Sequence, residues 1–246
     1  MIDPGQVFRY TGYAGSLIST ESEVTNMTNY TPLQIKAYDL IKERILDGEY
    51  KPDTIYSLTK EAATLGISRT PLKDAMTRLA NDRYIDIIPS KGFVLHHLSD
   101  TEMYNTYQVR CALESFAAIE LAKSKSKKTL NVMKRHLQQM KKLIDAKGKL
   151  DTILQYDLAF HEALISSLDN PEISSLFESN NYTLYQMAAK TYRNENRFLD
   201  AHHEHMSIIE AIESGSVSRS FDAVTQHLDI TRDLTIESLR DTVRIS

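Results

Sequence analysis

Three histidines and one aspartate in the second half of the chain are of the residue types that form transition-metal sites. Asp157 and His161 are four residues apart, so both side chains leave the same face if this segment is a helix. His205 and His227 lie in later segments that also have helical periodicity. Three imidazoles and one carboxylate from three helices suit Zn²⁺, Ni²⁺ or Mn²⁺ in the interior of a helical bundle.

Other interpretations of these residues remain open. A single histidine in a helix is more often simply packed or exposed than bound to a metal. His202 and His203 lie within one helical turn of His205 and compete with it as ligands. The same four residues could also serve a metal-dependent hydrolase or lyase, in which Glu162 or Glu204 would be the general base.

A second group of residues has the character of a helix that contacts DNA. In the segment 68–79, Leu72, Ala75, Met76 and Leu79 form an apolar stripe at helical spacing. This stripe leaves Arg69, Thr70, Lys73 and Thr77 or Arg78 pointing outward. Arginine can bind guanine with two hydrogen bonds, and hydroxyls and lysine reach phosphates or base edges. The alternative is an ordinary helical hairpin with a solvated basic face.

The flanking residues predict the elements that would position this segment. Ser57 can cap a preceding helix that Gly66 ends, and Ser68 can cap the next helix, in which Pro71 occupies the first turn. After the second helix, two apolar runs flank Pro89-Ser90-Lys91-Gly92, which predicts a β-hairpin with Lys91 and Gly92 at its tip. Helix, turn, helix and hairpin together predict a winged helix-turn-helix.

The rest of the chain predicts a mainly α fold with two domains. Residues 1–30 have no sustained periodicity, so we expect a flexible arm. Thr31 and Pro32 begin a helix that Gly48 ends, and residues 31–96 form the winged domain. Residues 99–242 have no convincing strand and form an all-α bundle with predicted helices at 99–124, 127–147, 149–169, 171–191, 197–214 and 217–242.

Length, composition and charge limit the classes of protein to which this chain can belong. The chain has 246 residues, enough for two modest domains, and its net charge is −4. Residues 31–98 carry ten basic and nine acidic residues, so DNA binding would depend on a local patch and on salt. The single cysteine excludes an internal disulfide. No apolar run has membrane-spanning length and no signal peptide is evident, so we expect a cytoplasmic protein that does not bind membranes.

The segment from Ile67 to Ala75, with Leu79 and the Pro-x-Lys-Gly hairpin, resembles the DNA-binding domain of the GntR family of bacterial transcription regulators. The resemblance implies that this segment and the hairpin tip touch operator DNA. Lys73 stands where arginine is usual, so we expect it to anchor phosphate rather than read guanine, and Thr59 falls where some members have a DNA-contacting arginine. The predicted DNA-binding residues are Thr59, Ser68, Arg69, Thr70, Lys73, Arg78, Lys91 and Gly92.

The helical region is similar to the effector-binding (FCD-type) domain of the FadR-like branch of this family. The resemblance rests on Asp-x3-His at Asp157 and His161, on His205 before an Ile-Ile-x-Ala-Ile-x-x-Gly helix end, and on His227. It implies that these four residues hold a divalent metal at the floor of a ligand cavity.

The same resemblance gives a role to an arginine of the first helix of this region. Arg110 falls where relatives use an arginine to bind a carboxylate ligand; an ion pair with Glu114 is the alternative. Tyr104, Tyr107, Asn181 and Tyr185 are further candidates for the ligand cavity.

These expectations describe a bacterial transcription regulator, typically a repressor, and not an enzyme. We expect a homodimer that binds double-stranded operator DNA and responds to a small carboxylate or sugar acid beside the metal. A metal-sensing regulator without an organic ligand, and the metal-dependent enzyme, are the alternative functions.

Overall fold

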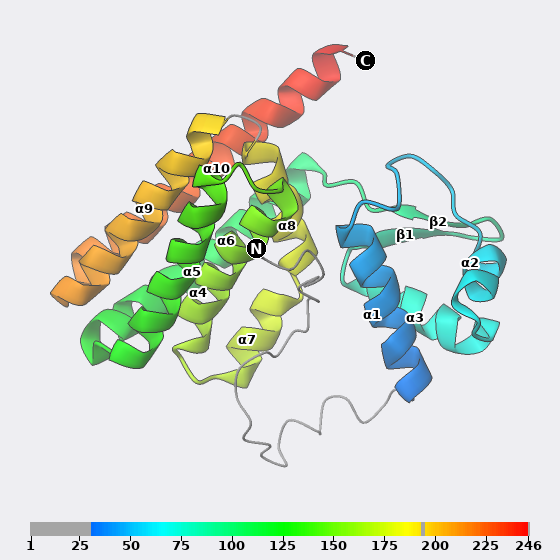
Figure 1. Cartoon of the computed structure of the whole chain (residues 1–246), viewed down its shortest axis with the longest axis horizontal. Coiled ribbons are helices and arrows are strands. Elements are labelled where there is room, and N and C mark those ends of the chain that lie inside the picture. The colour runs from blue at the N-terminus through cyan, green and yellow to red at the C-terminus, as the bar shows by residue number, and fades with distance from the viewer. Residues whose placement is uncertain (1–30, 193–194, 246) are drawn as a thin grey trace, which may run out of the picture. The chain divides into compact units, whose positions relative to one another are not determined.

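The computed structural model describes residues 31–192 and 195–245, and the flexible arm expected at residues 1–30 lies outside them. The chain divides into two compact units, and the division falls between Leu95 and His96. Figure 1 shows helices throughout the described residues except for one short hairpin. None of the helices in these ranges is both long and apolar enough to cross a membrane.

The first unit is a winged helix-turn-helix. Its elements are α1 (Pro32–Leu46), α2 (Leu58–Leu65), α3 (Arg69–Asn81), β1 (Ile85–Ile88) and β2 (Gly92–Leu95). The two strands pair antiparallel, with Ile85 opposite Leu95 and Ile88 opposite Gly92. Helix α3 packs against α1, α2 and β1, so it is the central element of the unit.

Local signals set the ends of these helices. Thr31 and Gln34 form a reciprocal capping box at the start of α1, and Gly66 ends α2 in the left-handed conformation with φ of 64°. Ser57 and Ser68 occupy the predicted N-cap positions of α2 and α3, but neither side chain makes a capping hydrogen bond. The hydroxyl of Ser68 is therefore not used by its own helix.

The predicted apolar stripe of α3 is the core of the first unit. Its members Leu72, Ala75, Met76 and Leu79 are at most 1% exposed. They pack against an α1 face whose buried residues are Ala37, Tyr38, Ile41 and Ile45. Ile35 and Leu40 of the same helix are only half-buried.

The second unit is an all-α bundle, and no strand occurs in its described residues. Its helices are α4 (Asp100–Ser124), α5 (Lys127–Asp145), α6 (Leu150–Ser166), α7 (Pro171–Glu178), α8 (Asn181–Thr191), α9 (Glu195–Ser214) and α10 (Val217–Ile245). Helix α10 packs against α4, α8 and α9, while α5 packs against α6 and α9. Large side chains such as Phe160, Leu164, Ile209 and Leu228 fill the core between them.

The single helix predicted for residues 171–191 is wrong, because α7 and α8 are separate helices. The side chains of Ser179 and Asn180 both donate to the carbonyl oxygen of Leu176. These bonds compete with the helical backbone hydrogen bonds, so the helix ends at this point. The break lets α8 take its own direction and pack on α10 and α6.

Candidate metal centre and DNA-contacting surface

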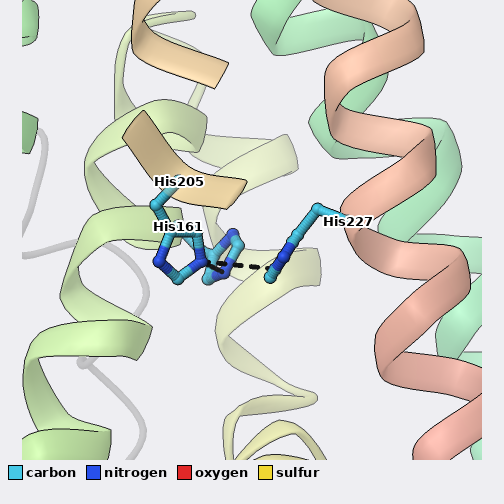
Figure 2. Close-up of side chains that lie close together, drawn as sticks. All are labelled: His161, His205 and His227. Carbon is cyan, nitrogen blue, oxygen red and sulfur yellow. Dashed lines mark hydrogen bonds between the residues drawn. The ribbon is translucent and has the colours of Figure 1, made fainter. Parts of the chain in front are cut away.

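The three predicted histidine ligands meet in the core of the helical bundle. His161 of α6, His205 of α9 and His227 of α10 are at most 4% exposed. Figure 2 shows their imidazoles pointing toward one another. The Nε2 atom of His205 lies 3.2 Å from Nε2 of His161 and 3.3 Å from Nε2 of His227. Neighbouring nitrogen ligands of tetrahedral Zn²⁺ are about 3.3 Å apart, so the donor set fits a transition-metal ion.

Two carboxylates, the buried Glu114 and the half-buried Glu204, orient two of these rings. Nδ1 of His161 lies 2.6 Å from Glu114 Oε2, and Nδ1 of His227 lies 2.7 Å from Glu204 Oε2. A carboxylate acceptor stabilises the tautomer that carries its proton on Nδ1. The lone pair of Nε2 is then free to face the centre of the cluster. Nδ1 of His205, in contrast, is buried without a hydrogen-bond partner among the described residues.

Each carboxylate is in turn held by an arginine. Arg110 Nε donates to Glu114 Oε1 at 2.6 Å, which is the ion pair considered from the sequence. Arg197 donates to both oxygens of Glu204, at 2.5 and 2.9 Å. The side chains therefore form two hydrogen-bonded chains, Arg110–Glu114–His161 and Arg197–Glu204–His227, which support the histidine cluster from different helices.

Burial and these charges favour the ionised form of Glu114 and Glu204 and the neutral form of His205 and His227. Burial by itself would raise the pKa of Glu114, but Arg110 and His161 outweigh it and lower the pKa to about 2. Burial also opposes ionisation of Glu204, yet hydrogen bonds from His227 and Arg197 lower its pKa. Burial, with His227 and His161 nearby, lowers the pKa of His205 well below its usual value. Neutral imidazoles are the form that binds metal ions.

Asp157 lies beside the histidine cluster but is engaged elsewhere. Its Oδ1 accepts a hydrogen bond from the Tyr192 hydroxyl at 2.6 Å and is 3.6 Å from His205 Nε2. The three histidines, without Asp157, form the group whose ligand atoms all lie within 4.8 Å of one another. His202 and His203, the competing candidates, are not in that group, and their rings contact each other.

A pocket of about 580 Å³ opens next to the second of these chains. Arg197 and Glu204 line it together with Thr191, Asn196, Asp200, His203, Ile230 and Leu234. Glu204 also contacts His227, so one residue joins the pocket wall to the histidine cluster. Arg197 Nε and Arg110 Nη2 are both buried without a partner among the described residues, so each is a donor available to a ligand.

None of the residues predicted for the effector site lines this pocket. Arg110 supports His161, and the Tyr107 hydroxyl donates to Asp229. Asn181 Nδ2 donates to Glu162 Oε1 at 3.1 Å. The Tyr185 hydroxyl donates to Asp151 Oδ1 at 2.7 Å. Tyr104, the remaining candidate, is half exposed.

Sequence reasoning missed Arg197 entirely and assigned Glu204 only as a general base. The spacing of Glu204 and Arg197, seven residues apart on one helix, was the available signal. The ion pair of Glu114 with Arg110 was the alternative considered from the sequence, but the second contact of Glu114, with His161, joins residues 47 apart and could not be read from local spacing.

Most of the predicted DNA-contacting residues are exposed at one end of α3 or on the hairpin. Ser68, Arg69, Thr70 and Lys73 are exposed at the N-terminal end of α3, and Lys91 is exposed at the hairpin turn. Thr59, at the start of α2, is also exposed.

Two of the predicted contact residues also pack within the winged unit. The guanidinium of Arg78 lies 4.0 Å from the centre of the Tyr38 ring, and its Nε is 3.8 Å from Asp82. Gly92 is buried, with φ of 142°, and a Cβ atom at this position would lie 1.9 Å from the carbonyl oxygen of Tyr56. Glycine is therefore required here for the close packing of the hairpin.

Comparison with known proteins agrees with this two-part architecture. The family model "Bacterial regulatory proteins, gntR family" matches residues 33–95, and the model "FCD domain" matches residues 105–230. The HTH-type transcriptional regulator YdhC of Bacillus subtilis (strain 168), itself uncharacterized, is 26% identical over 80% of this chain and 87% of its own length.

Two further proteins are similar to this chain over most of its length. The gluconate operon transcriptional repressor of Bacillus licheniformis is 26% identical over 75% of this chain and 80% of its own length. A GntR-type transcriptional regulator from Rhodococcus sp. RHA1 superposes with a TM-score of 0.74, covering 85% of this chain and 98% of that one. Its sequence is only 17% identical, so this likeness concerns the fold alone.

Proposed function

Because this chain belongs to the GntR family of bacterial transcription regulators and has an FCD domain, we propose that a metal and a small organic acid control its binding to DNA. The regulator binds operator DNA as a homodimer, through two winged domains at half-sites about one helical turn apart. The acid shifts the population of arrangements of the two recognition helices, and repression released by the acid is the expected direction.

In this proposal the N-terminal end of α3 enters the major groove. Arg69 reads a base, while Ser68, Thr70 and Lys73 bind base edges or phosphates, and Lys91 and Thr59 add backbone contacts. Their exposure supports this assignment, as does the capping position of Ser68, whose hydroxyl its own helix does not use. Arg78 and Gly92 are left out because they pack within the domain.

The observation that carries the metal proposal is the convergence of three buried Nε2 atoms, two of them oriented by carboxylates. His161, His205 and His227 would hold Zn²⁺, Ni²⁺ or Mn²⁺, with Asp157 as the fourth ligand. When bound, the ion supplies a Lewis-acidic position that an acid's carboxylate can occupy. Asp157 can bind the ion while it accepts the hydrogen bond from Tyr192, because a carboxylate has acceptor sites on both oxygens.

The effector proposal rests on the two buried arginines. Arg110 and Arg197 each keep one donor without a partner among the described residues, and a carboxylate or hydroxyl oxygen satisfies such a donor. We therefore assign Arg197 to the effector site in place of Tyr107 and Tyr185, whose hydroxyls donate to carboxylates. Asn181 remains a candidate, because its Nδ2 donates to Glu162 but its Oδ1 is buried without a partner among the described residues. The relative named for the gluconate operon supports a sugar acid as the first class to test.

The test is a thermal-shift screen of metal-stripped and Zn²⁺-loaded protein against gluconate and a panel of other small acids. We expect the melting temperature to rise with metal and to rise again with one acid only when metal is present, because ligands that bind the native state stabilise it. The double variant His161→Ala, His227→Ala should lose both responses and retain DNA binding. A wild-type protein that responds to no metal would refute the site.

Measurements of DNA affinity and of acid consumption distinguish the two alternative functions. A metal-sensing regulator would change its DNA affinity with metal alone, without any acid. A hydrolase or lyase would consume an acid from the panel. The enzyme is disfavoured because both general-base candidates are engaged, Glu204 by Arg197 and His227 and Glu162 by Asn181.

A further inference from the structure

One segment of the helical unit has a charge opposite to that of its surroundings. Residues 123–149, which contain the end of α4, all of α5 and the turns on either side of α5, carry ten basic residues and one acidic residue, a net charge of +9. The other residues of 99–246 carry eight basic and twenty acidic residues, a net charge of −12. Solvated helix faces ordinarily carry charged side chains of both signs. A segment with this excess of positive charge is therefore a candidate for binding an anionic partner.

Most of these cations are exposed and have no ion-pair partner in the described part of the chain. Three lysines do have one: Lys123 pairs with Glu120, Lys134 with Glu213 and Lys141 with Asp145. The remaining seven form what we call the α5 basic surface, which consists of Lys125, Lys127, Lys128, Arg135, Lys142, Lys147 and Lys149.

The spacing of the basic residues aligns them on one side of α5. Basic pairs recur every seven residues, at 127–128, 134–135 and 141–142. Seven residues are about two helical turns, so the pairs lie above one another. The opposite side of α5 buries Leu130, Met133, Leu137 and Met140 and holds the helix against α6 and α9. The charged side is therefore presented outward by a rigid helix.

The dimensions of this surface suit a polyanion. Helix α5 has 19 residues, which is about 28 Å of helix at 1.5 Å per residue. Duplex DNA presents one phosphate charge per ~1.7 Å of its axis, or roughly 16 charges over that length.

The residue types favour duplex DNA over the other polyanions. Six of the seven cations of the α5 basic surface are lysine, which binds phosphate as a point charge and is depleted at protein–protein interfaces. Single-stranded nucleic acid is bound through aromatic stacking platforms, and α5 contains no Phe, Tyr or Trp.

We propose that the α5 basic surface binds the phosphate backbone of duplex DNA without sequence preference, as a second DNA contact beyond the winged domain. The winged unit carries little net positive charge with which to bind phosphates, since residues 31–98 carry only one more basic than acidic residue. The second contact would supply the salt-dependent, sequence-independent part of the affinity.

The experiment uses the full chain and a mixed-sequence 40-base-pair duplex. The variant Lys128→Gln, Arg135→Gln, Lys142→Gln removes three unpaired cations from one stripe. If each neutralises one phosphate, the slope of log affinity against log salt should fall by about 2.7 per protomer, and affinity at low salt at least tenfold. The matched control Lys128→Arg, Arg135→Lys, Lys142→Arg keeps the charge and should bind as the wild type does. A neutralised variant with unchanged slope and affinity overturns the proposal.

A residue-level measurement separates contact from long-range attraction. Lysine acetylation followed by mass spectrometry should find Lys127, Lys128 and Lys142 protected by the duplex, both in the wild type and in Arg69→Ala. Protection that persists in Arg69→Ala shows that the α5 basic surface contacts DNA independently of the recognition helix. The proposal for the α5 basic surface can therefore fail while the proposed operator contact stands. Equal acetylation with and without DNA, or protection by polyglutamate but not by DNA, shows the proposal to be wrong.

Discussion

Replacing Glu204 by glutamine tests whether the carboxylates, and not only the three histidines, build the metal centre. Glu204 accepts from Arg197 through both oxygens and contacts Nδ1 of His227 at 2.7 Å. A glutamine has the same shape, but its amide nitrogen is a donor. When the amide donates to Nδ1 of His227, the ring proton moves to Nε2, which points into the cluster and can then no longer bind a metal.

The expected loss follows from the position of Glu204. Removing a carboxylate that supports a metal-binding histidine typically costs 10- to 100-fold in metal affinity, or about 1.4–2.7 kcal/mol. The Arg197 side chain is 7% exposed and loses its charged partner, so the metal-free protein should also lose about 1.5–3 kcal/mol of stability. The Glu204 side chain is 17% exposed, which keeps this cost below that of a fully buried pair.

The assay is chelator competition for Zn²⁺, with urea unfolding of the metal-free protein to measure the second effect. Glu210→Gln is the matched control, because Glu210 is exposed on the same helix and should leave the Zn²⁺ affinity unchanged. A Glu204→Gln protein that binds Zn²⁺ within threefold of the wild type would refute the role assigned to the Arg197–Glu204–His227 chain.

Three further predictions concern other parts of the chain. Arg69→Ala should abolish sequence-specific DNA binding with an unchanged melting temperature, since Arg69 is exposed; DNA selection from random sequences checks this, and retained selectivity would contradict it. In the metal-free protein, burial lowers the pKa of His205 below that of the unfolded chain, so the unfolded state binds more protons below pH ~6.5. Stability should therefore be full above pH ~6.5 and fall by up to ~1.4 kcal/mol per pH unit below it, which urea unfolding at pH 7.5, 6.5 and 5.5 measures. Gly92→Ala should destabilise the winged domain by more than about 1 kcal/mol in thermal unfolding, because its Cβ would overlap the carbonyl oxygen of Tyr56.

Local sequence patterns were sufficient for the elements of the winged domain. The stripe Leu72, Ala75, Met76 and Leu79 repeats at the helical period, and each member is buried. Gly66 ends α2 because only glycine adopts its left-handed conformation without strain. The break at Ser179 and Asn180 was missed, because their competing hydrogen bonds to Leu176 act against an otherwise continuous helical pattern.

In the helical unit, local sequence patterns predicted the histidines but not the contacts that orient them. The identity of its three histidines could be read from their motifs, yet the contact of Glu114 with His161 and the pairing of Tyr192 with Asp157 join residues 47 and 35 apart. The predicted effector residues Tyr107, Asn181 and Tyr185 have suitable chemistry, but the structure engages each with a carboxylate. Arg78 likewise has the charge for DNA but lies on the Tyr38 ring.

The sequence by itself therefore determined the winged helix-turn-helix, the all-α bundle, the family and the histidines of the candidate metal centre, since periodicity, caps and motifs are local properties of the chain. Only the tertiary structure decided which side chains orient those histidines and which polar groups stay available to a ligand. Packing of α4, α6, α9 and α10 brings His161, His205 and His227 together from positions 44 and 22 residues apart. Contacts of this kind depend on how whole helices pack, so the spacing of residues along the chain cannot predict them.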